Sequence, residues 1–74
     1  MKYLIRDGKV EYSGNKQAVI NYIREAYEDD YFVQEYGKIF LKDFSKFIFC
    51  LENLGLILSD RKPKRRGRWI YHQN

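Results

Sequence analysis

The sequence predicts a small α+β domain, and three observations support this. A strand–turn–strand signal opens the chain, two strongly periodic helical segments follow, and two β-rich segments flank a basic run near the C-terminus. Of the 74 residues, 45% are hydrophobic and 18% aromatic, which is enough to close a small core without disulfides or a metal. We therefore expect a single domain over residues 1–74.

The first element is a predicted β-hairpin over about residues 2–12. Asp7-Gly8 is a strong two-residue turn signal, because a type I′ turn needs positive φ at both central positions. With this turn, two cross-strand pairs share one face, Ile5 with Val10 and Tyr3 with Tyr12. The opposite face, with Leu4 facing Glu11, is mostly polar, so we expect the first face to cover the core.

A helix is predicted over about residues 15–29, with Ser13 or Asn15 as its N-cap. Its apolar residues recur at helical spacing: Val19, Tyr22, Ile23, Ala26 and Tyr27. The acidic trio 28–30 is unfavourable at a helix C-terminus, so the helix should end near it, and Asp29 or Asp30 should cap the next element.

Residues 31–40 leave two alternatives open. One is a short helix over 31–36 with Gly37 as its C′ residue. The other is a brief strand over 38–40. The next helix, over about 41–54, has the strongest signal: its apolar residues keep 3/4 spacing, and Gly55 follows it as the C′ glycine.

Two predicted strands, about 56–60 and 67–72, flank the sequence RKPKRRG, in which Pro63 and Gly67 act as breakers. We therefore expect a second hairpin whose tip is basic. Residues 61–74 carry six basic side chains and no acidic one, whereas the rest of the chain holds eight basic and ten acidic groups. This asymmetry in a chain of net charge +4 favours a polyanionic partner.

The helix 41–54, its ending Leu51-Glu52-Asn53-Leu54-Gly55-Leu56-Ile57 and the basic hairpin after it resemble the C-terminal half of a winged helix-turn-helix domain. The resemblance covers roughly residues 16–72. It implies a recognition helix over 41–54 and a wing over 56–72. The residues that it places against DNA are Lys42, Ser45, Lys46 and Asn53 in the helix and Arg61, Lys62, Lys64, Arg65, Arg66 and Arg68 in the wing.

Catalysis finds little support in the sequence. Cys50 lies within an apolar run and His72 has no partner at catalytic or metal-ligand spacing, so we expect a non-enzyme without a metal or cofactor. The N-terminus meets a charged residue after three apolar ones, and no apolar run approaches the length of a membrane span. A cytoplasmic protein without membrane contact is therefore expected.

Two functional hypotheses follow. The first is a small protein that binds double-stranded DNA, such as a transcriptional regulator or, given the chain's size, an accessory protein of a phage or other mobile element. The second is a protein-interaction module or inhibitor that binds an acidic or nucleic-acid-binding surface of a host protein. Exposed aromatic residues also permit a homodimer.

Overall fold

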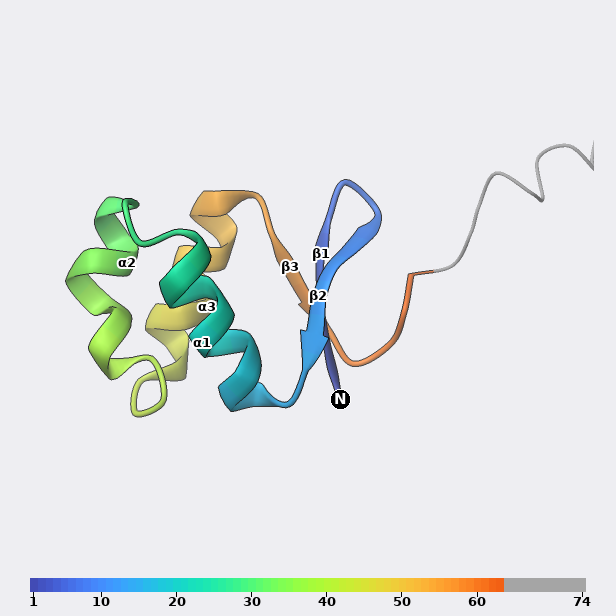
Figure 1. Ribbon diagram of the computed structural model, residues 1–74, viewed down its shortest axis with the longest axis horizontal. Helices are drawn as coiled ribbons and strands as arrows, with labels where there is room; N and C mark the ends of the chain where they lie inside the picture. Colours follow the sequence, from blue (N-terminus) through green and yellow to red (C-terminus); the bar gives the residue numbers. More distant parts are fainter. Residues whose placement is uncertain (64–74) are drawn as a thin grey trace, which may run out of the picture.

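The computed structural model describes residues 1–63 and shows an α+β fold (Figure 1). A three-stranded antiparallel sheet lies at one end, and three helices lie on one side of it. The predicted strand 67–72 and the site residues Lys64, Arg65, Arg66 and Arg68 lie outside the described residues.

The N-terminal hairpin is confirmed as strands β1 (Lys2–Arg6) and β2 (Lys9–Gly14). Asp7 and Gly8 have φ of 52° and 78°, the positive values that a type I′ turn requires. The turn brings Ile5 opposite Val10, as predicted.

The predicted register beyond that pair is wrong because β2 contains a β-bulge. Tyr3 faces Ser13 rather than Tyr12, Leu4 faces Tyr12, and Glu11 is the extra residue between the two registers. The core face of β1 is therefore the opposite of the predicted one: Leu4 is fully buried, whereas Val10, opposite Ile5, is 40% exposed. Tyr12 packs against the core as predicted, because the bulge places it opposite Leu4. A single extra residue reverses the side on which every later side chain lies.

Helix α1 (Lys16–Ala26) begins where the Asn15 side chain accepts a hydrogen bond of 2.8 Å from the backbone N–H of Ala18. The helix ends three residues before the predicted limit, ahead of the acidic trio. Asp30 then caps helix α2 (Tyr31–Tyr36), as expected, by accepting from two backbone N–H groups.

The short helix over 31–36 is thus confirmed, but its predicted ending is wrong. Gly37 has right-handed φ and ψ of −54° and −34° and opens a 3₁₀ turn, η1 (Gly37–Ile39), in place of a left-handed stop or a strand. The chain then turns through residues 40–43 into helix α3.

Helix α3 (Phe44–Leu54) begins three residues later than predicted, because the Asp43 side chain accepts from the backbone N–H of Lys46 and caps the helix there. Gly55 ends it with φ of 75°, as expected. The N–H of Leu56 donates to the carbonyl of Leu51 at 2.8 Å, the bond that reverses the chain in a Schellman motif.

That reversal delivers strand β3 (Ile57–Ser59), slightly shorter than predicted, to the edge of the N-terminal hairpin. β3 pairs antiparallel with β1, with Leu58 opposite Leu4, so the strand order is β2-β1-β3. The core lies between this sheet and the helices and is formed by Leu4, Val19, Ile20, Ile23, Val33, Phe40, Phe47, Cys50, Leu51 and Leu56. Within residues 1–63 there is no helix long and apolar enough to cross a bilayer.

Candidate nucleic-acid interface

The candidate residues on α3 are less available for reading bases than their types indicate. The hydroxyl of Ser45 donates to the Asp43 carboxylate at 2.6 Å, and this bond, with the backbone N–H of Lys46, holds the pKa of Asp43 below its ordinary value. The side-chain amide of Asn53 donates to the Phe49 carbonyl one turn back, at 2.9 Å. Both side chains thus already make hydrogen bonds within the helix.

The other two candidates are lysines. The Nζ of Lys46 lies 4.8 Å from the centre of the Tyr36 ring, a cation–π contact that joins α3 to α2. Lys42 is exposed in the turn before α3. The exposed side of α3 also carries Phe49, which is 44% exposed, and Glu52, neither of which suits the edge of a base. Binding through this helix would therefore rest on Lys46 and on Lys42 in the preceding turn.

The basic run comprises residues 61–68, and the structure describes its first residues, which follow directly after the sheet. Arg61 and Lys62 are exposed, and the backbone N–H of Arg61 donates to the hydroxyl of Ser59 at 3.0 Å. Just before them, the Asp60 carboxylate lies 2.7 Å from the Nζ of Lys2 on β1. The basic run therefore leaves the fold from a defined position.

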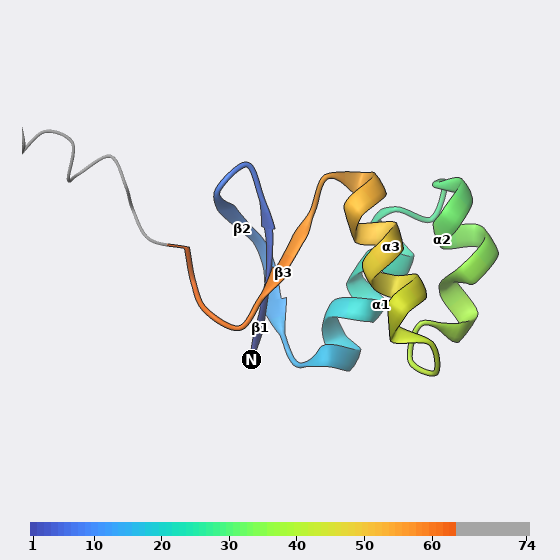
Figure 2. The same cartoon turned by 180° about the vertical axis from the view of Figure 1, so that it is seen from behind.

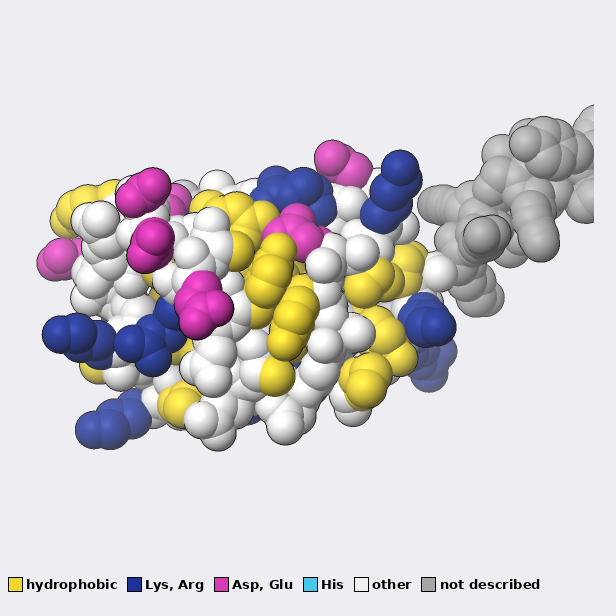
Figure 3. All heavy atoms as spheres, in the orientation of Figure 1, with side chains coloured by type: hydrophobic (Ala, Val, Ile, Leu, Met, Phe, Trp, Pro, Cys, Tyr) yellow, Lys and Arg dark blue, Asp and Glu magenta, His cyan; other side chains and the backbone are white. Residues whose placement is uncertain are grey.

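Four segments lie along one edge of the molecule, the lower edge in Figure 1. They are the N-terminus, the first turn of α1, the turn before α3 and the bend directly after β3, from which the chain rises again toward residue 63, and Figure 2 shows the same edge from behind. We call their basic residues the cationic edge: Lys2, which is paired with Asp60, and Lys16, Lys42, Arg61 and Lys62. In the space-filling view, acidic side chains occupy the upper and middle parts of the visible face and none lies at its lower margin (Figure 3).

Lys2 and Lys16 were not among the residues predicted from the sequence. The Nζ of Lys16 lies 4.3 Å from the centre of the Phe44 ring, so a cation–π contact links the start of α1 to the start of α3. No local signal marks either lysine, because Lys16 lies beside Phe44 and Lys2 beside Asp60 only in the folded chain.

A polar cluster joins the hairpin β1–β2 to α1 and to the end of α3. The Glu11 carboxylate accepts hydrogen bonds from the hydroxyls of Tyr22, at 2.8 Å, and Tyr27, and from the Nε of Arg6 at 3.0 Å. Arg6 also donates to Tyr27 and to the carbonyl of Leu54 at the end of α3. Because the bulge turns Glu11 toward the helices, sequence reasoning missed this cluster.

The cluster shifts the pKa values of its members. Burial alone raises the pKa of Glu11, but the hydrogen bonds from Tyr27, Tyr22 and Arg6 outweigh it and leave the pKa below its ordinary 4.5. The hydrogen bond to Glu11, reinforced by burial, raises the pKa of Tyr22 to about 12 from 10.0. The pKa shifts of Glu11 and Tyr22 are absent from the unfolded chain. The free energy of unfolding therefore depends on pH wherever either group titrates.

We expect the free energy of unfolding to fall at both extremes of pH. The contribution of Glu11 is present above pH 4.5 and is lost as the pH falls through its lowered folded value. The contribution of Tyr22 is present below pH 10 and is lost as the pH rises from 10 toward 12. Urea titrations across this range should show both losses, and Glu11→Gln should reduce both. An unchanged acid limb in that variant would contradict this assignment.

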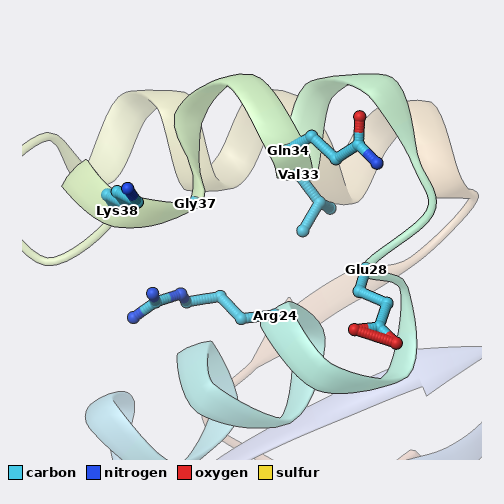
Figure 4. A pocket seen from close by; sticks show the side chains of 6 residues that line it. All are labelled: Arg24, Glu28, Val33, Gln34, Gly37 and Lys38. Carbon is cyan, nitrogen blue, oxygen red and sulfur yellow. The ribbon is translucent and has the colours of Figure 1, made fainter.

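The described residues also contain a hollow between α1 and α2 that is open to solvent (Figure 4). It is lined by Arg24, Glu28, Val33, Gln34, Gly37 and Lys38. Within residues 1–63 no three His, Cys, Asp or Glu side chains are grouped to hold a metal ion. Cys50 is buried in the core, where desolvation raises the pKa of its thiol, so it is not an activated nucleophile.

No protein-family model matches this chain, and no curated protein or solved structure does either. The likeness to winged-helix domains therefore stays a prediction, and any function assigned to the chain rests on its own charge and geometry.

Proposed function

We propose that this chain is a small DNA-binding protein that holds double-stranded DNA mainly by its phosphate backbone. The observation that carries the proposal is the cationic edge, whose basic residues belong to four separate segments with their backbone toward one edge of the fold (Figure 1). In the sequence this edge continues into Lys64, Arg65, Arg66 and Arg68. Aligned cations of this kind displace counterions from a duplex, and that release supplies most of the affinity of such binders.

The order of elements supports a winged-helix mode of binding. Helices α1, α2 and α3, with the turn over residues 40–43, precede a strand that leads directly into the basic run. In this mode α3 approaches the major groove with its N-terminal end, where Lys46 lies in the first turn and Lys42 in the turn before the helix. The basic run then takes the role of the wing along the backbone or in the minor groove.

Backbone contact should dominate over base reading. Ser45 and Asn53 already make hydrogen bonds within α3, and Phe49 and Glu52 share its exposed side. The proposed protein therefore binds duplexes of different sequence with similar affinity, as an accessory protein of a phage or other mobile element, or a broadly acting regulator, would.

The salt dependence of binding tests this proposal. If four to six cations each neutralise one phosphate, the slope of log K against log salt should be roughly −4 to −5. Fluorescence anisotropy with a labelled duplex at several salt concentrations measures it. Scrambled duplexes of equal length serve as controls and should bind within about tenfold of one another. A slope near zero would exclude phosphate binding by the basic residues.

A second candidate function is binding to another protein, through the basic run on an acidic or nucleic-acid-binding surface of a host protein. One observation favours protein interaction generally: Tyr31 on α2 and Phe49 on α3 are large aromatic side chains exposed to solvent. Exposed aromatic residues that lie together are typical of protein interfaces.

A further inference from the structure

An aromatic patch covers the junction of α2 and α3, and we define it as Tyr31, Phe32, Tyr36 and Phe49. Tyr31 is 65% exposed and Phe49 is 44% exposed, whereas the other two are half-buried. The Phe32 ring bridges them, with its centre 5.2 Å from that of Tyr31 and 5.0 Å from that of Phe49, both in edge-to-face geometry. The four rings thus form one surface.

This patch is preformed. Asp30 caps α2 immediately before Tyr31 and fixes the first turn of that helix. The Phe32 and Tyr36 rings stack 6.3 Å apart along α2, and Lys46 covers the Tyr36 ring from α3. Side chains already held in place lose little conformational entropy when a partner binds, which favours use as an interface.

Carboxylates flank the exposed rings. Glu35 lies one turn after Tyr31 on α2, and Glu52 lies one turn after Phe49 on α3, and both are exposed. Lys46 contacts the Tyr36 ring, but the two carboxylates disfavour phosphate beside Tyr31 and Phe49, and they would repel each other if two such patches met. The fitting occupant is a cationic protein segment, because Arg and Lys pair with carboxylates and stack on aromatic rings.

We propose that this patch binds the basic run, residues 61–68, of a second copy of the chain. That run has six basic residues and no acidic one, and Trp69 follows it in the sequence. The chain itself thus supplies a segment whose charge is complementary to the carboxylates beside the patch. The described residues after β3, up to residue 63, lie on the side of the sheet away from the helices (Figures 1 and 2), and we therefore propose a second copy as the partner of the patch.

The contact is head-to-tail, since each copy offers its run to one neighbour and its patch to another. Such contacts do not close after two copies and make assemblies that grow with concentration. The inference does not rest on DNA binding, although DNA would compete for the same run and shorten the assemblies. A chain that fails to bind DNA can still assemble, so the two proposals fail separately.

Sedimentation velocity on the full-length chain at low salt tests the proposal. The weight-average mass should rise with protein concentration and return to that of the monomer in high salt. Phe49→Ser should weaken assembly by at least about tenfold. Ile57→Ser is the matched control, because Ile57 is 63% exposed on the sheet and lies outside the patch. Thermal melts confirm that both variants fold.

A charge swap identifies the two partners in the contact. The variants Glu35→Lys/Glu52→Lys and Arg65→Glu/Arg66→Glu should each be monomeric alone. Mixed together they should form a 1:1 dimer. The first variant keeps its basic run, and the second keeps the aromatic patch with Glu35 and Glu52 beside it. Monomer at all concentrations of the wild type, assembly unaffected by Phe49→Ser, or a mixture that stays monomeric would each overturn the proposal.

Discussion

Replacing Arg61, Lys62, Lys64, Arg65 and Arg66 with Ser is expected to lower duplex DNA affinity by at least about a hundredfold at about 0.1 M salt. The change moves the formal net charge from +4 to −1 and removes the part of the cationic surface that is continuous in sequence. Most counterion release should disappear with it, so the salt slope should flatten toward zero. Fluorescence anisotropy titrations at several salt concentrations measure both quantities.

A matched pair of variants separates the position of charge from its amount. Lys16→Ser/Lys42→Ser removes two charges from the cationic edge, and Lys9→Ser/Arg24→Ser removes two from β2 and the hollow beside α1. We expect the first pair to weaken binding by about tenfold or more and the second by much less. Equal losses of affinity in the two double variants would show that only net charge matters. If the variant with five Ser replacements bound DNA as tightly as the wild type, the basic run could not act as a wing.

Local sequence signals predicted the local structure well. Asp7-Gly8, Asn15, Asp30 and Gly55 each act through a backbone group or a side chain within a few residues, so their roles could be recognised without knowledge of the fold. The observed helix limits differ from the predicted ones by three residues where a neighbouring acidic side chain sets the boundary, as Asp43 does for α3.

Features that depend on long-range contacts were not predictable. The pairing of β3 with β1 joins residues more than fifty positions apart, and the bulge at Glu11 leaves no trace in the hydrophobic pattern. The candidate site likewise combines features that local sequence predicts with features that only the folded chain reveals. Residue types on α3 indicated DNA contact, but the hydrogen bonds of Ser45 and Asn53, and the place of Lys16 on the cationic edge, appear only in the folded chain.

The inverted face of the sheet leads to a large difference between two similar substitutions. Leu4→Ala removes a fully buried side chain from the core and should cost about 2–5 kcal/mol of unfolding free energy. Ile57→Ala shortens a side chain that is 63% exposed on the other face and should cost about 0.5 kcal/mol or less. In a domain of this size the first change should lower Tm by roughly 10 °C or more.

Thermal and urea unfolding followed by circular dichroism give the measurement, and Leu4→Val provides a milder variant that retains the fold if Leu4→Ala does not. Comparing Leu4→Ala with Ile57→Ala distinguishes the two registers. The register without a bulge exposes Leu4, so it predicts that Ile57→Ala is the more destabilising change. If Ile57→Ala destabilised the protein more than Leu4→Ala, the helices would have to cover the other face of the sheet. The Glu11 cluster could not then form, since its carboxylate reaches Tyr22 and Tyr27 only from the side that Leu4 shares.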